Sequence, residues 1–454
     1  MWDEVKYQTG FGSEFASEDS RAPGALPPSQ NTPQKCPYGL YAEQISGTAF
    51  TAPRSKNART WVYRMLPSAK HRRFERVQER EDFTHDWNEE YPDPNQKRWL
   101  PFKMPQDEEK VDFVQGLKVV SGAGDPKCRH GTAIYVYTCN SSMQDSAFYS
   151  SDGEFLIVPQ EGTLKIQTEM GLLVVEPGEL AVIPQNIRYA VHIDGASRGY
   201  ICEVFGTRFT LPNLGPIGAN GLANPRDFEY PTAFYVEKEG KFRIFNKYQG
   251  KQFVCEQDHS CFDVVGWHGN YSPYKYNMWK FSAVNSVTFD HMDPSIFTVL
   301  TAPSLEEGTA VVDLAIFPPR WSVHEHTFRP PYYHRNVMSE FMGLICGKYE
   351  AKEDGFLPGG ATLHSIGTPH GPDAECFSKA SSSLSEPQFI GSGQLAFMFE
   401  TSLMLAITKW GQKTCQVLDD QYYECWQKLQ KNFSLENKPD ENDKDFFRNL
   451  GTGI

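Results

Sequence analysis

The 454-residue sequence contains no apolar run long enough to cross a membrane. The longest candidate, Leu395 to Ile407, is interrupted by Glu400. The N-terminal segment MWDEVKYQTG is polar and lacks the apolar core of a signal peptide. The 10 cysteines are scattered without a Cys-x-x-Cys pair, which predicts reduced and mostly buried thiols. Together these absences predict a cytosolic protein with no membrane partner.

Positive charge is also scarce. The net charge of −13 argues against a nucleic-acid surface and against binding to an anionic membrane. Basic residues cluster from Lys70 to Arg73, but acidic residues from Glu79 to Glu90 follow at once, a pattern typical of a solvated face. No glycine-rich dinucleotide motif follows a strand, because GANGL at Gly218 fits no strand–turn–helix pattern. We therefore expect neither a nucleic-acid partner nor a dinucleotide cofactor.

Proline and glycine, by contrast, are abundant, with 31 and 36 residues, and they predict a turn-rich chain that is mainly β. The length exceeds that of a single core, so we expect two domains, residues 1–280 and 281–454. The first hundred residues are irregular and rich in proline. We expect this segment to wrap over another domain or a neighbouring subunit.

Short apolar runs alternate with turn residues from Thr132 to Phe205, which predicts an antiparallel sandwich or jelly roll. Gly162, Gly171 and Gly178 stand where hairpins need a positive φ. The segment resembles a cupin barrel but lacks the metal-binding histidines, so a structural role is expected for it. A second strand-rich region follows, and a helix is predicted from Leu418 to Phe433. The expected fold is mainly β, with cupin-like or jelly-roll sandwich domains and few helices.

Residues that could bind a metal gather between Arg329 and Asp373, where His334, Glu340, His364 and His370 occur. Two imidazoles and one carboxylate form the ligand set of non-haem Fe(II) enzymes that activate oxygen. Glu340 precedes the apolar segment FMGLIC, which predicts a carboxylate at the start of a buried strand. Its partner could be a metal ion, or Arg335 or Arg329 in a structural ion pair. Spacing alone does not decide whether His364 or His370 is the second imidazole ligand.

Three other histidines stand in conspicuous contexts. His324 and His326 form the His-x-His pair with which a cupin metal site begins, but no carboxylate follows at the required spacing. We interpret both as loop histidines. His268, in WHGNYSPYKYN, is predicted to lie in a packed loop at a subunit contact.

The segments RPPYYHRNVMSEFMG and PGGATLHSIGTPHGPD, which carry these candidate ligands, resemble the homogentisate 1,2-dioxygenases. YQTGFGSEF, LYAEQISGTAFTAPR, LGPIGANGLANPRDF, WHGNYSPYKYN and FDHMDPSIFTVLTAP are similar to the same family. The resemblance extends over nearly the whole chain, up to about Asn432. It implies cleavage of the homogentisate ring by O₂ to give 4-maleylacetoacetate in tyrosine and phenylalanine catabolism, with Fe(II) as cofactor, in a homohexamer built as a dimer of trimers.

The resemblance also implies roles for individual residues. His334, Glu340 and His370 would be the iron ligands, and His291 the base that accepts a proton from the substrate. The residues expected to contact the substrate are Tyr349, His364, His370 and Asn336.

Two other classes of protein are also compatible with this sequence. A zinc-dependent hydrolase or isomerase could employ the same three ligands with water in an open position. A storage protein of two cupin domains would need no metal ligands. Bound iron and oxygen uptake would distinguish the dioxygenase from both.

Overall fold

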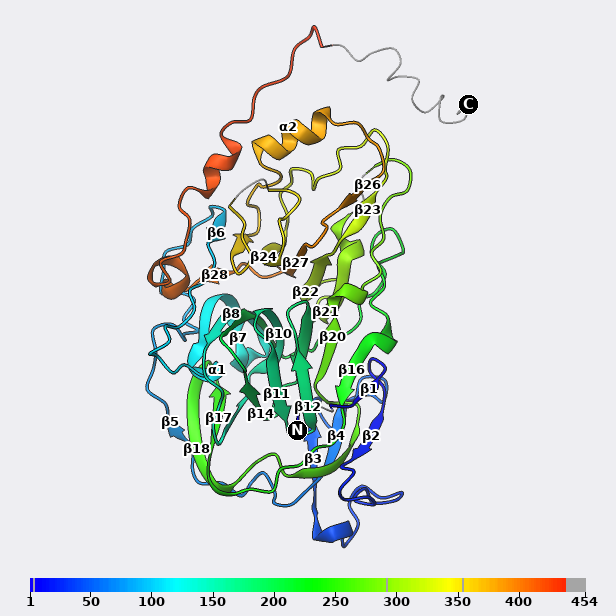
Figure 1. Cartoon of the computed structure of the whole chain (residues 1–454), viewed down its shortest axis with the longest axis vertical. Helices are drawn as coiled ribbons and strands as arrows, with labels where there is room; N and C mark the ends of the chain where they lie inside the picture. Colours follow the sequence, from blue (N-terminus) through cyan, green and yellow to red (C-terminus); the bar gives the residue numbers. More distant parts are fainter. Residues whose placement is uncertain (3–4, 291–292, 353–354, 438–454) are drawn as a thin grey trace.

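The computed structural model describes residues 1–2, 5–290, 293–352 and 355–437 (Figure 1). Strands dominate, and within the described residues the α-helices are the short α1 (Phe113–Gly116) and α2 (Ala374–Ser382). Single turns complete the helical structure: η1 (Pro37–Gly39), η2 (Pro126–Cys128), η3 (Pro225–Asp227), η4 (Met278–Lys280), η5 (Pro294–Phe297), η6 (Trp410–Thr414) and η7 (Tyr422–Trp426). The predicted mainly-β fold with few helices is confirmed.

The N-terminal part is a sandwich of two large sheets with a smaller sheet beside them. The first sheet has the order β1 (Tyr7–Thr9), β16 (Phe228–Pro231), β20 (Tyr274–Asn277), β13 (Glu179–Ile183), β10 (Gly153–Glu161), β15 (Ser197–Phe205), β8 (His130–Cys139), β7 (Leu117–Asp125) and β28 (Ala406–Ile407). The second has the order β12 (Gly171–Val175), β11 (Leu164–Thr168), β14 (Tyr189–His192), β9 (Ser146–Ser150), β17 (Glu239–Tyr248), β18 (Lys251–His259) and β5 (Glu75–Arg76). The smaller sheet has the order β2 (Phe15–Glu18), β19 (Val264–Gly269), β4 (Arg59–Arg64) and β3 (Tyr41–Ser46).

The C-terminal part is built on another sheet, which carries most of the candidate site. Its order is β21 (Thr298–Pro303), β22 (Ala310–Phe317), β27 (Leu395–Thr401), β24 (Ser339–Cys346), β25 (Ala361–His364) and β6 (Lys97–Trp99). A small ribbon of β23 (Arg320–Ser322) and β26 (Gln388–Ile390) lies beside it.

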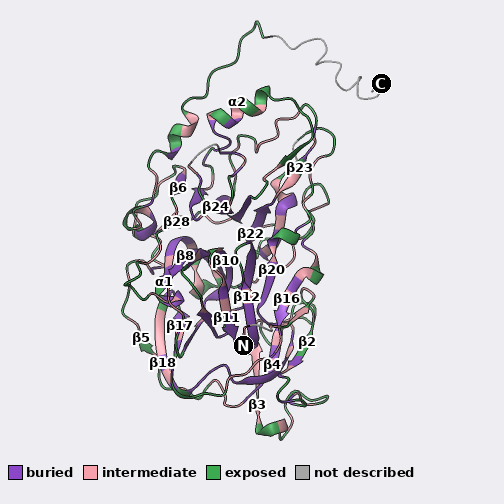
Figure 2. Cartoon of the chain, viewed as in Figure 1, coloured by how far each residue is buried: buried purple, intermediate pink, exposed green. Residues whose placement is uncertain are grey.

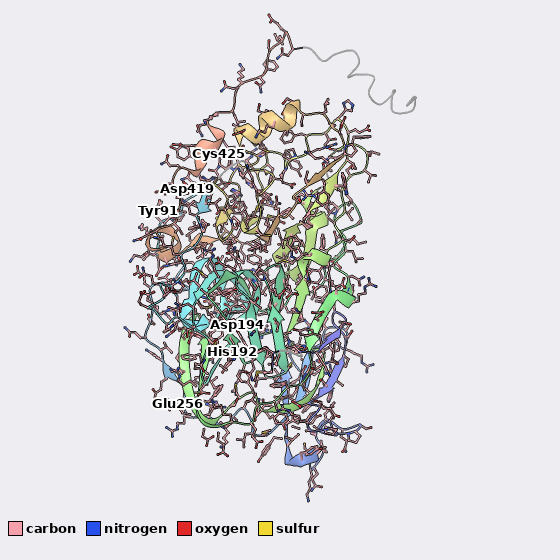
Figure 3. The ribbon with its side chains drawn as sticks, in the orientation of Figure 1. Tyr91, His192, Asp194, Glu256, Asp419 and Cys425 are labelled. Atoms are coloured by element: carbon pink, nitrogen blue, oxygen red, sulfur yellow. The ribbon has the colours of Figure 1, made fainter. Side chains whose placement is uncertain are left out.

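Local sequence explains the N-terminal sandwich. Its apolar runs became strands whose residues are nearly all buried, as the purple strands of Figure 2 show. Gly162, Gly171 and Gly178 take φ values of 76°, 135° and 95°, as the hairpin turns require. His192 lies in this sandwich (Figure 3), and the metal group that the described side chains form is in the C-terminal part. The metal group thus lies outside residues 132–205, which agrees with the structural role predicted for that segment.

The two parts are interlocked by exchanged strands. The first hundred residues are less irregular than expected, since they contain strands β1 to β6, and β6 pairs with β25 at the edge of the C-terminal sheet. In return, β28 pairs with β7 at the edge of the first sheet. The pairing of β6 with β25 suits the predicted wrapping of the N-terminal segment over another domain, which stays a prediction. One hydrophobic cluster extends through both parts, and the expected domain boundary at residue 280 stays a prediction.

The helix predicted from Leu418 to Phe433 is wrong. Leu418 forms an antiparallel bridge with Trp99, and the Asp419 amide donates to the Arg98 carbonyl at 2.8 Å, so the chain is extended where the helix should begin. Only the single turn η7 follows, and Phe433 is 75% exposed. Figure 3 labels Asp419 and Cys425 on this C-terminal segment.

The ten cysteines are free, as predicted, but only five of them are buried, so the thiols are less buried than expected. Among the described residues, no helix is both long enough and apolar enough to cross a membrane.

Gly343 tests how tightly the C-terminal sheet is packed. A Cβ added there would lie 2.4 Å from the Phe397 ring and 3.1 Å from the Tyr200 ring. We expect Gly343→Ala to lower the free energy of unfolding by about 1–3 kcal/mol, because β24 must shift to relieve the clash. Denaturant unfolding measures this, with Gly195→Ala as the control, since nothing lies within 4 Å of a Cβ at that position. Equal stability of the two variants would contradict the packing described here.

Candidate metal centre

The candidate metal centre is formed by His334, Glu340 and His370, which three different segments bring together. Glu340 is the second residue of β24 and is 6% exposed, as the apolar segment after it predicted. His334 and His370 lie in loops on either side of β24 and β25. Their backbones form an isolated antiparallel bridge, in which each amide donates to the other residue's carbonyl, at 3.0 and 3.1 Å. This bridge fixes both imidazoles beside the carboxylate.

The side chains converge on one point. The imidazole Nε2 of His334 lies 3.3 Å from Oε1 of Glu340, and Nε2 of His370 lies 3.1 Å from Oε2. One donor atom from each of the three residues lies within 4.8 Å of the others. Donors bound at about 2 Å to a single ion are separated by about 3 Å, so the group needs little rearrangement to hold one metal ion.

Hydrogen bonds behind the imidazoles prepare both rings as ligands. Nδ1 of His334 lies 2.8 Å from the Tyr332 carbonyl, and Nδ1 of His370 lies 3.0 Å from the Thr368 carbonyl. A carbonyl only accepts, so each Nδ1 carries the proton. Each Nε2 then faces Glu340, where it donates to the carboxylate when it is protonated and offers its lone pair to a metal ion when it is not. This is the arrangement found behind metal-binding histidines in general.

The charges in the centre favour a cation. Burial alone would raise the pKa of Glu340, but the hydrogen bonds from His334 and His370 outweigh it and hold the pKa far below its usual range. The hydrogen bond to Glu340 raises the pKa of His334, against the opposing effect of burial. A buried carboxylate is thus kept ionised between two imidazoles, and a metal ion satisfies that charge.

An ion pair between Glu340 and an arginine is absent from the described residues. Arg329 donates instead to the carbonyls of His324, Ser385 and Glu386. No contact between Arg335 and Glu340 is found within the described part of the chain either. The structure therefore favours the metal reading of Glu340 over the structural ion pair.

Asn336 and Glu400 support the carboxylate ligand from behind. The Asn336 amide donates to Oε1 of Glu340 at 3.0 Å and to Oε1 of Glu400 at 2.8 Å, and its carbonyl accepts from the Met338 amide. Burial, together with the charge of Glu340, raises the pKa of Glu400 to about 7. The structure thus engages Asn336 in orienting Glu340, and its predicted contact with substrate stays a prediction.

His364 lies beside the centre rather than in it. It ends β25, is 5% exposed, and stacks on His370 with ring centres 3.9 Å apart. Its Nε2 lies 3.0 Å from the Tyr422 hydroxyl, and its Nδ1 has no hydrogen-bond partner within the part of the chain that the structure describes. Burial, and then the neighbouring His370, lower the pKa of His364 well below its usual value, so the ring is neutral.

A cavity of about 610 Å³ opens above these residues, a volume in the range of small-molecule sites. His334, Glu340, His364 and His370 line it together with Tyr349, which is 7% exposed. Burial raises the pKa of Tyr349 far above its usual value, so its hydroxyl stays protonated and can donate to a ligand.

The remaining predicted residues lie elsewhere. His291 is outside the described residues. His324 and His326 lie in the segment between β23 and β24 and belong to no metal group within the described chain, in agreement with their interpretation as loop histidines. His268 corrects an expectation: it lies in strand β19 rather than in a loop, and its Nε2 is 3.2 Å from the Tyr63 hydroxyl. It is held there by the pairing of β19 with β2 and β4.

Sequence reasoning missed Glu400 and Tyr422. Glu400 had a signal, because it is a single carboxylate within an otherwise apolar strand, β27. Tyr422 had none, because its place in the wrongly predicted helix suggested only packing.

Two imidazoles and one carboxylate beneath a cavity in a mainly β fold form a donor set that suits a single metal ion, as in mononuclear metalloenzymes. The family described as "Homogentisate 1,2-dioxygenase N-terminal" matches residues 6–278, and the one described as "Homogentisate 1,2-dioxygenase C-terminal" matches residues 279–433. The chain belongs to the homogentisate 1,2-dioxygenase family, and it is therefore a dioxygenase.

Curated relatives support this membership over almost the full length. The homogentisate 1,2-dioxygenase of Drosophila melanogaster is 62% identical over 95% of this chain and 99% of its own. Those of Mus musculus and Homo sapiens are 59% and 58% identical, each over 95% of this chain and 97% of the relative. Among solved structures, a cupin 2 conserved barrel domain protein from Leptotrichia buccalis covers 63% of this chain and 88% of its own, with a TM-score of 0.27 and 8% identity. That overlap is too weak to bear on function.

Asn336 provides a test of the support behind the ligands. We expect Asn336→Ala to weaken metal binding by about 10- to 100-fold, because Glu340 and Glu400 lose the shared donor that holds them in place. Metal titration of the apoprotein measures the affinity. The matched control is Asn432→Ala, the same truncation at an exposed residue. Unchanged affinity in Asn336→Ala would rule out the supporting role.

Proposed function

We propose that His334, Glu340 and His370 bind Fe(II), and that the cavity above them binds homogentisate and O₂ for cleavage to 4-maleylacetoacetate in tyrosine and phenylalanine catabolism. The observation that carries the proposal is the convergence of both Nε2 atoms on the Glu340 carboxylate at the wall of this cavity. Family membership supports the reaction, and the donor set supports the metal.

The three ligands suit Fe(II) chemically. Two neutral imidazoles and one carboxylate neutralise only half of the charge of a divalent ion. When bound, Fe(II) supplies the unpaired electrons without which the reaction of O₂ with a closed-shell aromatic ring is spin-forbidden. Both oxygen atoms enter the product, so the reaction balances without an added reductant.

The remaining cavity residues bind and orient the substrate in this proposal. Homogentisate carries one carboxylate and two ring hydroxyls, and these need polar partners in the cavity. Tyr349 is placed to donate its protonated hydroxyl to a substrate oxygen. His364 and His370 contact the substrate from one wall, and Asn336 is proposed to contact it beside its bonds to Glu340 and Glu400.

His291 is proposed as the base. An imidazole is the side chain best suited to accept a phenolic proton near neutral pH, because its unperturbed pKa lies close to that pH. Removal of the proton makes the ring more electron-rich and thus more reactive toward oxygen. The family resemblance, which places the base at this position, supports the assignment.

Three further properties belong to the same proposal. The chain divides into domains near residue 280, it assembles as a homohexamer (a dimer of trimers), and it acts in the cytosol. The large exposed apolar side chains support assembly, among them Leu305, which is 96% exposed, and Val337, which is 81% exposed. Ten free cysteines fit a reducing compartment.

Glu340→Gln tests the metal assignment. The amide is a weaker ligand without charge, so we expect the folded variant to lose most of its iron and its activity. Metal analysis after anaerobic loading with Fe(II), followed by O₂ uptake with homogentisate, measures both. Glu375→Gln is the control, because it removes the same charge at an exposed position on α2. Full iron occupancy in Glu340→Gln would exclude this ligand, and oxygen uptake by a zinc-loaded wild-type protein would exclude the iron chemistry.

His291→Ala separates a base from a ligand. We expect this variant to retain its iron while turnover falls by about 10²- to 10⁴-fold, the range for loss of a general base. Iron content and O₂ uptake on one preparation decide between the roles. Asp293→Asn serves as the control, because Asp293 caps η5 through the Ser295 amide and should affect stability more than chemistry. Loss of iron from His291→Ala would instead make His291 a ligand, and turnover near wild type would make it a bystander.

A further inference from the structure

The hydrogen bonds of the two ring nitrogens of His364 determine what this buried side chain can offer a ligand. His364 lines the cavity and is 5% exposed, yet its Nδ1 has no hydrogen-bond partner among the described residues. A buried polar nitrogen without a partner is costly and therefore uncommon. It marks a place where a ligand atom is expected. What that ligand must offer depends on which ring nitrogen carries a hydrogen, and the hydrogen-bond geometry at the other nitrogen bears on this.

The partner of the other nitrogen answers this question. Nε2 of His364 lies 3.0 Å from the hydroxyl of Tyr422, a residue that is 1% exposed. Burial raises the pKa of Tyr422 far above its usual value, so the hydroxyl always carries its hydrogen. Within the described residues, His364 is the hydrogen-bond partner of that hydroxyl.

Two arrangements are possible, and they differ in what they leave unsatisfied. If Nε2–H donated to Tyr422, the tyrosine hydrogen and the Nδ1 lone pair would both be buried without partners. If Tyr422 donates to Nε2, only the Nδ1–H group remains unpaired. The second arrangement is favoured because it leaves fewer buried polar groups unsatisfied.

We propose that Tyr422 is a positioning residue that holds His364 in its Nδ1–H tautomer, which makes His364 a hydrogen-bond donor to an anionic oxygen of the substrate. His364 then does not act as a base. The proposal rests on the proposed function, because the ligand in question is an aromatic acid with a carboxylate and ring hydroxyls. The proposal also gives the C-terminal segment a role in substrate binding, because that segment places Tyr422 at the cavity.

Contacts around Tyr422 support a fixed position for its hydroxyl. The Arg98 guanidinium lies over its ring at 4.6 Å, and Trp426 packs against it with ring centres 5.0 Å apart. Arg98 itself is held by Asp419, three residues before Tyr422, with Nε 2.8 Å from the carboxylate. The ring is thus clamped independently of its hydroxyl. Tyr422→Phe should therefore remove one hydrogen bond and leave the packing in place.

The test is a double-mutant cycle read out as anaerobic binding of homogentisate to the Fe(II) protein by calorimetry. Tyr422→Phe should raise the Kd about tenfold, the factor that corresponds to one lost hydrogen bond, with iron content unchanged. Tyr423→Phe is the matched control, because Tyr423 is 49% exposed and no contact between it and His364 is found in the described structure.

Two substitutions of His364 complete the cycle. The amide nitrogen of His364→Asn stands where Nδ1 stood and donates without help from Tyr422, so Tyr422→Phe should change its Kd less than twofold. The amide of His364→Gln stands at the Nε2 position, so it should bind homogentisate as weakly as Tyr422→Phe does. A tenfold effect of Tyr422→Phe in the His364→Asn background as well, or none in the wild type, would overturn the proposal.

A further arm identifies the substrate oxygen. If the cycle is repeated with 2,5-dihydroxyphenylacetamide, retained coupling between Tyr422 and His364 assigns the donor to a ring hydroxyl oxygen. Lost coupling or lost binding assigns it to the carboxylate. Failure of the proposed function is distinguishable, because the wild-type Fe(II) protein would then neither bind homogentisate nor take up O₂.

Discussion

Two backbone hydrogen bonds between His334 and His370 are the constraint on which the candidate metal centre depends. Without this bridge, the imidazoles would belong to two independent loops. With it, both rings have a fixed separation, and each Nδ1 reaches a carbonyl two residues earlier in the chain. The regular sheet supplies the third donor, Glu340, next to the bridge. The geometry of the centre is therefore set by backbone pairing, and the side chains only complete it.

A second consequence of the sheet is that acidic groups face one another. β24 pairs with β27 so that Glu340 stands opposite Glu400, and Asn336 donates to both. Two buried carboxylates this close cannot both ionise without cost, and the raised pKa of Glu400 reflects this. The negative charge is thus concentrated on Glu340, where the metal would be held.

The sequence predicted those parts of the fold that depend on local patterns. Strands between residues 132 and 205 followed from alternating apolar runs and from glycines at turns such as Gly162. The buried strand after Glu340 followed in the same way. The helix at Leu418 failed because pairing with the distant Trp99 outweighs helical periodicity. Tyr422 and Glu400 could not be placed at the site for a related reason: strand pairing and the path of the C-terminal segment bring them there, and neither leaves a local pattern. His291, outside the described residues, keeps its predicted role untested.

The position of β6 has a consequence for how the protein is made. Lys97–Trp99 leave the ribosome long before β25, their partner strand, has been synthesised. The outer position of the C-terminal sheet is thus filled by a segment that must remain available until the rest of that sheet exists. A C-terminal half produced alone would present the free edge of β25, which invites strand-to-strand association with other copies. The solubility of the C-terminal part is therefore expected to depend on a segment encoded far upstream in the gene.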